Sequence, residues 1–193
     1  MTAPTDPLER WRRVAPRFSE IADAVPSARW DDPAPCDGWV ARDVVRHLVD
    51  WIPPFLTSGS GITIDLPDDV DVERDPAGAW RSLAELIEAA LVTRGGETFS
   101  HPKAGDHRLD AAIDVFITSD VLVHTWDLAT ATGQPAGLDE ELAAEAAGAM
   151  ASLTDVLVAS GHYARPVEVA PHADPTTRLI AITGRDPNWA PNR

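Results

Sequence analysis

Hydrophobic residues recur along the chain at the spacing of amphipathic helices. In the first segment, apolar residues follow one another at alternating steps of three and four, which indicates a single core-facing seam: Leu8, Trp11, Ala15, Phe18, Ala22 and Val25. Similar patterns predict helices over residues 6–25, 39–52, 77–93, 109–132 and 139–160. The sequence therefore predicts an all-α protein built on a four-helix bundle.

Proline, glycine and aspartate mark where these helices begin and end. We expect the second helix to begin with Asp37 as its cap and to end before Pro53, because proline disrupts a helix interior. Residues 53–76 and 97–106 are expected to be connecting loops. A short helix is predicted between Asp174 and Gly184, with these two residues as its caps.

The predicted domain organisation follows from these elements. We expect residues 1–160 to form the helical bundle and residues 161–193 to form a short C-terminal extension packed on it. A chain of 193 residues is long enough for one domain with a substantial core.

The charge and composition of the chain disfavour some classes of binding partner. The net charge is 16 − 31 = −15, which disfavours binding to nucleic acids and to anionic membranes. The sequence has no apolar run of about 20 residues and no signal-peptide pattern, so we expect a cytoplasmic protein without a membrane partner. Cys36 is the only cysteine, which excludes an internal disulfide and a multi-cysteine zinc site.

The helix over residues 109–132 carries the first candidate site. Asp120 and His124 lie four residues apart, on or beside its apolar stripe, so their side chains are neighbours on one face. Asp127 follows three residues later and points nearly the same way. Polar groups that face a core need partners. A divalent metal would satisfy this pair, and so would an Asp–His hydrogen bond.

A second histidine is placed in the same way. His47 lies within the apolar stripe of the second predicted helix. Two histidines and one carboxylate form a three-ligand set, which leaves coordination positions open as in catalytic metal sites. We therefore take His47, Asp120 and His124 as candidate metal ligands. In the alternative interpretation the three residues only hydrogen-bond to one another.

Other polar residues offer weaker candidates. Asp127 is expected to orient His124 or to act as an alternative ligand. A nucleophilic Cys36 is disfavoured by its acidic neighbours, and His101 and His107 are expected to be exposed. The sequence contains no Gly-rich phosphate loop and no nucleophile elbow.

Three stretches together resemble a known family. They are PCDGWVARDVVRHL from Pro35, DVLVHTWDLATATGQ from Asp120 and LIAITGRDP from Leu179. The first two resemble the metal motifs of the DinB-like proteins related to mycothiol-dependent maleylpyruvate isomerase. The third is similar to the ending of one actinobacterial metal-binding subgroup. The resemblance spans nearly the whole chain, and its motifs occur in the expected order.

The resemblance implies a fold and a chemistry. It implies a DinB-like four-helix bundle that holds a divalent ion, commonly zinc with nickel as the alternative, through His47, Asp120 and His124. It also implies mycothiol as a cosubstrate whose thiolate the metal would favour. The chain departs from the isomerase in having Asp120 where the isomerase has Glu, and it has Val40 where a capping Thr is frequent.

Two functional hypotheses follow. In the first, the protein is a metal-dependent, thiol-dependent transferase or isomerase that acts on a small molecule. In the second, it is a non-catalytic metal- or ligand-binding bundle linked to stress. A homodimer is compatible with both hypotheses, and the sequence does not identify the substrate.

Overall fold

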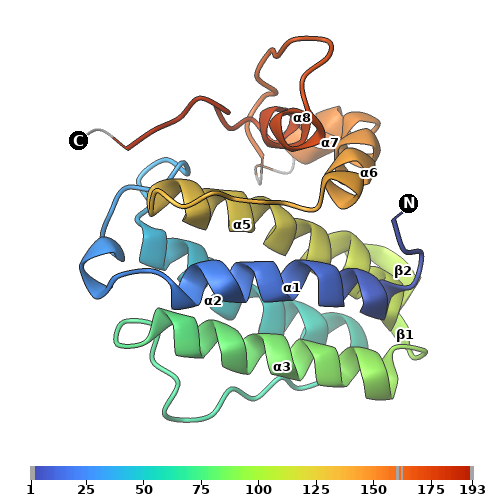
Figure 1. Cartoon of the computed structure of the whole chain (residues 1–193). Coiled ribbons are helices and arrows are strands. Elements are labelled where there is room, and N and C mark those ends of the chain that lie inside the picture. The colour runs from blue at the N-terminus through green and yellow to red at the C-terminus, as the bar shows by residue number, and fades with distance from the viewer. Residues whose placement is uncertain (1–2, 160, 162, 192–193) are drawn as a thin grey trace.

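The structure, a computed structural model, describes residues 3–159, 161 and 163–191. Its main layer is a bundle of four helices that lie side by side (Figure 1): α1 (Pro7–Asp23), α2 (Ala41–Ser60), α3 (Pro76–Arg94) and α5 (Ser119–Ala131). A short 3₁₀ turn, η1 (Ser27–Arg29), follows α1. The prediction of an all-α bundle is confirmed, apart from one small hairpin.

The predicted seam of α1 forms the centre of the core. Trp11 and Phe18 are fully buried and pack against Trp80 of α3, with ring centroids 6.1 and 4.4 Å from that of Trp80. The indole N–H of Trp80 donates a hydrogen bond to the Ser19 hydroxyl at 2.8 Å, so the buried polar atom of this tryptophan has a partner.

Three further helices lie on one side of the bundle, next to α5 (Figure 1): α6 (Glu140–Ala151), α7 (Thr154–Ala159) and α8 (Pro175–Ile182). α8 packs mainly against α6 and also contacts α5. Asp174 caps α8 as expected, accepting a hydrogen bond from the amide of Thr177 at 2.8 Å. Ser160 lies outside the described residues, so the boundary at residue 160 stays a prediction.

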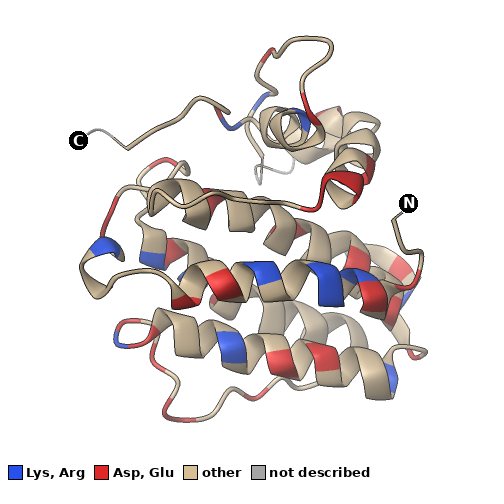
Figure 2. Ribbon diagram, viewed as in Figure 1, with Lys and Arg blue, Asp and Glu red and all other residues tan. Residues whose placement is uncertain are grey.

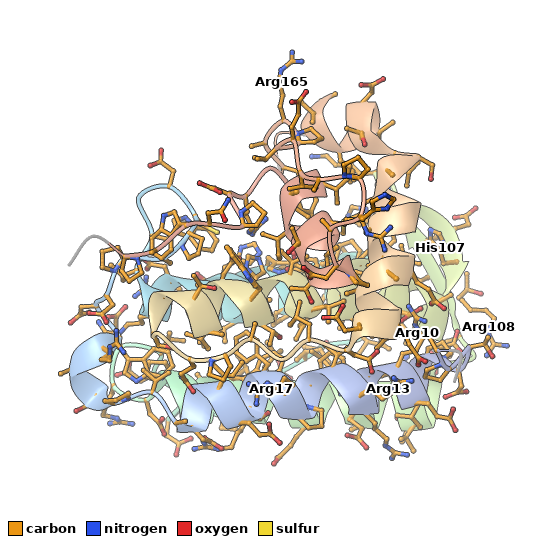
Figure 3. The ribbon with its side chains drawn as sticks, turned by 45° about the horizontal axis from the view of Figure 1, so that its top comes forward. Arg10, Arg13, Arg17, His107, Arg108 and Arg165 are labelled. Atoms are coloured by element: carbon orange, nitrogen blue, oxygen red, sulfur yellow. The ribbon has the colours of Figure 1, made fainter. Side chains whose placement is uncertain are left out.

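Arginines of α1 connect the bundle to α6 and to the segment that leads to α6 (Figure 3). Arg10 donates to Asp114 at 2.8 Å and to Glu145 of α6 at 2.7 Å. Arg13 pairs with Asp139, which caps α6, and Arg17 donates to backbone carbonyls in the segment that leads to α6. Residues at this spacing share one face of a helix, so α1 presents a row of donors to the linker and to α6.

The prediction that Asp37 caps the start of α2 is wrong. The first amides of the helix are satisfied by backbone carbonyls of the preceding loop: Ala41 donates to Asp32 and Arg42 donates to Trp30, both at 2.9 Å. The N-cap residue is Val40, and Asp43 accepts from its amide at 2.9 Å. Because the loop itself supplies the acceptors, no capping side chain from Asp37 is needed.

The predicted end of α2 is also wrong. The helix continues through Pro53 and Pro54 to Ser60 and ends at Gly61, whose φ is +67°. Each proline removes one donor from the helix. The turn after them buries Leu56 completely, and burial of a leucine side chain contributes about 1.5–3 kcal/mol. Tertiary packing therefore maintains the helix where local preference would stop it.

The predicted connector at 97–106 contains an antiparallel hairpin, β1 (Thr98–His101) and β2 (Gly105–Arg108). Phe99 is its buried anchor and packs directly on Gly59 of α2, where any side chain would collide with the ring. The other strand residues are largely polar, so the alternation that identifies a strand is nearly absent from the sequence.

The helix that carries Asp120 is continuous but irregular. α4 (Leu109–Ala112) passes into a π-helical segment, η2 (Ile113–Thr118), and then into α5. A π turn holds one more residue than an α turn, so it changes the register of the residues on either side. Asp114 faces Arg10 of α1, whereas Asp120 faces α2.

The predicted helix over 139–160 is broken between α6 and α7. The hydroxyls of Ser152 and Thr154 bond back to carbonyls of the preceding turn, at 2.8 Å to Ala149 and 3.1 Å to Ala151. Such bonds compete with the helical pattern. This segment is also exposed, with Val156 at 66%, so little packing opposes the break.

The exposed faces of α1 and α3 carry both signs of charge (Figure 2), although the chain as a whole is strongly acidic. Among the described residues, no helix has the length and apolar character required to cross a membrane.

The arginine row of α1 leads to a stability prediction. Arg10 and Asp114 are both largely shielded from solvent, with side-chain exposures of 15% and 20%. We expect Arg10→Met to lower the free energy of unfolding by about 1–3 kcal/mol, because it leaves a shielded carboxylate without its donor. Arg12→Met is the matched control, since Arg12 pairs with Glu88 at the surface, and it should lower stability much less. Urea unfolding measures both, and equal losses would contradict the role given to Arg10.

Candidate metal centre

α2 and α5 bring the three candidate ligands together. His47 Nε2 lies 3.3 Å from Asp120 Oδ2, and His124 Nε2 lies 3.5 Å from Asp120 Oδ1. One donor atom from each residue fits within a group whose members are all within 4.8 Å of one another. His124 and Asp120 are one helical turn apart on α5, and His47 faces them from α2.

The site is closed on one side and open on the other. Side-chain exposure falls from 31% at His47 to 13% at Asp120 and 4% at His124. Burial by itself would raise the pKa of Asp120, but His124, His47 and the more distant Arg185 lower it below its ordinary value. Asp120 is therefore a carboxylate at neutral pH, accessible from the His47 side.

Two tryptophans frame the histidines. The Trp51 indole N–H donates to Asp120 Oδ2 at 3.1 Å. Trp39 stacks on His124, with ring centroids 6.0 Å apart and an interplanar angle of 15°, and its centroid lies 5.2 Å from that of His47. Trp51 lies four residues after His47, which places both side chains on one face of the helix.

Asp127 holds the other nitrogen of His124. Its Oδ2 lies 2.8 Å from His124 Nδ1, and its side chain is completely buried. Burial would raise the pKa of Asp127, but Arg185 and His124 lower it. A carboxylate only accepts hydrogen bonds, so Nδ1 of His124 carries a proton, and Nε2 is the ring nitrogen that faces Asp120.

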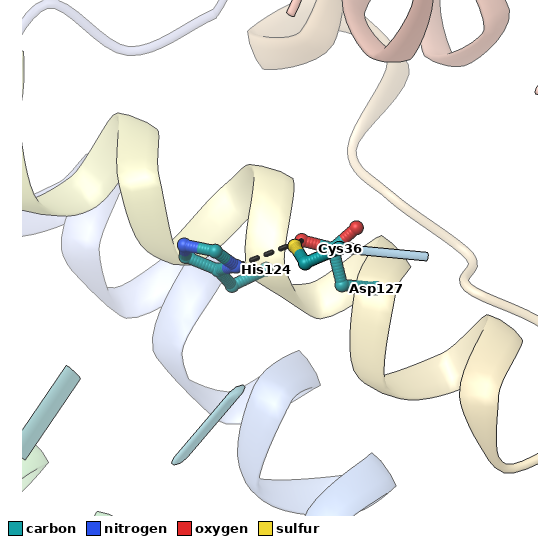
Figure 4. Close-up of side chains that lie close together, drawn as sticks. All are labelled: Cys36, His124 and Asp127. Atoms are coloured by element: carbon teal, nitrogen blue, oxygen red, sulfur yellow. Dashed lines mark hydrogen bonds and ion pairs between the residues drawn. The ribbon is translucent and has the colours of Figure 1, made fainter. Parts of the chain in front are cut away.

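Arg185 reaches the same carboxylate from the C-terminal segment. Its Nε lies 2.8 and 3.0 Å from the two oxygens of Asp127, and its Nη2 lies 2.8 Å from Oδ2. The same Nη2 lies 3.4 Å from Cys36 Sγ, and that sulfur lies 3.5 Å from Asp127. Cys36 and Asp127 thus lie on the Nδ1 side of the His124 ring, as Figure 4 shows.

The contact between His124 and Asp120 is suited to a cation. Nε2 of His124 faces Oδ1 of Asp120 at 3.5 Å, while Asp127 occupies Nδ1 of the same ring. A divalent ion, or a proton on Nε2, would bridge these two atoms. Two imidazole nitrogens and a carboxylate are ordinary zinc ligands, so the residues fit such an ion.

Cys36, His124 and Asp127 form a second cluster of metal-binding residue types. Both oxygens of Asp127 already accept from the guanidinium of Arg185, whose positive charge would repel a cation held there. This cluster is therefore better suited to orienting His124 than to holding an ion itself.

Other residues near the site were not predicted from the sequence. Burial raises the pKa of the Tyr163 hydroxyl and the charge of Asp120 raises it further, so this phenol lies within electrostatic range of the site. A cavity of about 340 Å³ lies between residues 33–39 and Trp189, and Cys36 and Trp39 are part of its lining. Nothing in the local pattern around Trp189 indicates this position.

The remaining polar candidates lie elsewhere. His101 and His107 are half-buried rather than exposed, because the hairpin packs them against Phe55 and Phe116. Neither belongs to a metal-binding cluster of the described residues. Asp50 is exposed.

The surroundings of Cys36 predict an unreactive thiol. Burial and the neighbouring Asp127 raise its pKa to about 12, against the pull of Arg185. Because the thiolate is the nucleophile, we expect iodoacetamide to alkylate the folded protein far more slowly than N-acetylcysteine at pH 8, with a rate that still rises above pH 10. The protein unfolded in urea is the control, since Cys36 is the only cysteine. A rate that levels off near pH 8 would contradict this environment.

Comparison with known proteins relates this geometry to a family. The domain described as "Mycothiol maleylpyruvate isomerase N-terminal domain" matches residues 3–57, the segment that contains α1 and His47. The uncharacterized proteins MT0763 and Rv0738 from two strains of Mycobacterium tuberculosis are each 30% identical to the chain over 156 residues. These alignments cover 77% of this chain and 79% of each relative. No solved structure gives a significant match.

The three kinds of observation agree. The motifs around His47 and Asp120, the all-helical fold and the matching domain all indicate the same group of proteins. The chain belongs to the DinB-like family of mycothiol maleylpyruvate isomerase-related proteins.

Proposed function

We propose that the protein binds a divalent metal ion, zinc in the first instance, through His47, Asp120 and His124, and uses it in a thiol-dependent transferase or isomerase reaction on a small molecule. The observation that carries the proposal is the convergence of His124 Nε2 and His47 Nε2 on the carboxylate of Asp120, at 3.5 and 3.3 Å.

Each residue near the centre has a role in this proposal. His47 and His124 supply neutral nitrogen ligands, and Asp120 supplies the negative charge. Trp51 holds one oxygen of Asp120 and thereby limits rotation of the carboxylate. The aspartate, one methylene shorter than the isomerase's glutamate, would keep the ion close to α5.

Three protein ligands leave coordination positions for other molecules. A bound zinc ion would polarise a substrate oxygen and lower the pKa of a thiol at such a position. The greater exposure of His47 supports an approach of thiol and substrate from the α2 side. The family relationship supports mycothiol as that thiol.

Metal binding has a direct test. We expect protein purified without a metal-affinity tag to contain close to one equivalent of zinc or nickel, and His47→Ala and His124→Ala to lose it, because each variant removes one of three ligands. His172→Ala is the control, since His172 is exposed near the start of α8. Elemental analysis after reconstitution with zinc measures the content. Metal-free wild-type protein, or equal zinc in all four proteins, would refute the proposed site.

Turnover separates an enzyme from a binding protein. We expect the zinc-loaded protein to consume maleylpyruvate or a related electrophilic small acid only when mycothiol is present, and Asp120→Ala to lower that rate at least 100-fold by weakening the metal site. The loss of substrate absorbance reports the reaction. Stoichiometric zinc without any thiol-dependent turnover across such substrates would favour the non-catalytic alternative.

A further inference from the structure

We propose that Arg185 is a positioning residue of the metal centre: its guanidinium clamps Asp127, and the clamped carboxylate holds His124 with Nε2 directed at the metal position. This inference rests on the proposed function for the identity of the metal position, and it adds the C-terminal segment to the machinery of the site.

The geometry of the clamp is specific to arginine. Two nitrogens of Arg185 make three contacts of 2.8–3.0 Å with the two oxygens of Asp127. A planar guanidinium can donate in this forked way, whereas a lysine ammonium acts as a single point of charge. The arginine side chain is largely shielded and that of Asp127 is fully buried, with exposures of 12% and 0%. Solvent therefore does not substitute for either partner.

The clamp acts on His124 through one oxygen. Asp127 Oδ2 receives Arg185 on one side and His124 Nδ1 on the other, each at 2.8 Å. Fixing both oxygens prevents rotation of the carboxylate, so the Nδ1 proton of His124 keeps one acceptor in one direction. The ring orientation and its tautomer follow, and Nε2 remains the nitrogen that faces Asp120.

The backbone before Arg185 turns the chain so that the arginine side chain reaches the site. Arg185 follows Gly184, which comes after Thr183, the C-cap of α8, and has a φ of +81°. A Cβ at Gly184 would also lie 2.6 Å from the Cβ of Ala164 and 2.7 Å from its carbonyl carbon, so only glycine fits. This turn directs the arginine back to α5, where it also donates to Cys36 at 3.4 Å.

The consequence is a site assembled from four separate segments. α2 supplies His47, α5 supplies Asp120, His124 and Asp127, the loop before α2 supplies Cys36, and the C-terminal segment supplies Arg185. All three proposed ligands come from α2 and α5. The orientation of His124 also depends on the C-terminal segment, which carries Arg185.

The test compares Arg185→Met and Arg185→Lys with Arg178→Met, an exposed arginine on the neighbouring helix that gives the same change of charge. Zinc affinity is measured on the full chain by competition with a chelator. The tautomer of His124 is measured on the metal-free protein by long-range ¹H–¹⁵N spectra of the imidazole, assigned with His124→Gln. Circular dichroism and thermal unfolding verify that each variant is folded.

We expect Arg185→Met to weaken zinc binding by about 10–100-fold and to make the His124 ring average between its two tautomers. Arg185→Lys should recover part of the affinity but not the single tautomer, and Arg178→Met should match the wild type. A purely structural arginine would leave the tautomer of the folded protein unchanged.

The failure of this inference is distinct from failure of the proposed function. If the wild type binds zinc, and folded Arg185 variants bind it equally with the same tautomer, the inference is wrong. If the wild type binds no zinc, the proposed function fails, and the tautomer in the metal-free proteins still decides whether Arg185 positions His124. If Arg185→Met does not fold, Arg185→Lys decides both measurements.

Discussion

The arrangement of the site depends on one constraint: the shielded carboxylate of Asp120 must be neutralised between two imidazoles. The side chain is 13% exposed, and its nearest polar contacts are His47, His124 and the Trp51 indole. A charge in such surroundings is unfavourable unless it is paired. The bundle provides the partners from α2 and α5. Asp127 binds Nδ1 of His124 and so leaves Nε2 as the nitrogen that faces Asp120. In the proposed function, a divalent cation binds all three side chains at once.

Much of this could be predicted from the sequence because it depends on local periodicity. The four-residue spacing of Asp120 and His124, and the place of His47 on an apolar stripe, depend only on helix geometry. The bundle, the cap at Asp174 and the proximity of the three residues are therefore found where the pattern indicates them. Their role as metal ligands stays a prediction.

The rest depends on contacts between distant segments, which local patterns do not encode. α2 passes Pro53 because packing of the following turn outweighs a lost donor, and Phe99 forms a hairpin anchor because Gly59 leaves space for it. The link between Arg185 and Asp127 joins positions 58 residues apart. The C-terminal motif that contains Arg185 was visible in the sequence, but its position beside the metal centre follows only from the fold.

The most direct measurement of the central claim is X-ray absorption spectroscopy at the zinc edge of the reconstituted protein without added thiol. The account predicts only nitrogen and oxygen neighbours at about 2.0–2.2 Å, with the outer-shell signature of two imidazoles, because His47, Asp120 and His124 are the proposed ligands. A sulfur neighbour at about 2.3 Å would contradict it, since that would place the ion on Cys36 and on Nδ1 of His124 instead of Nε2.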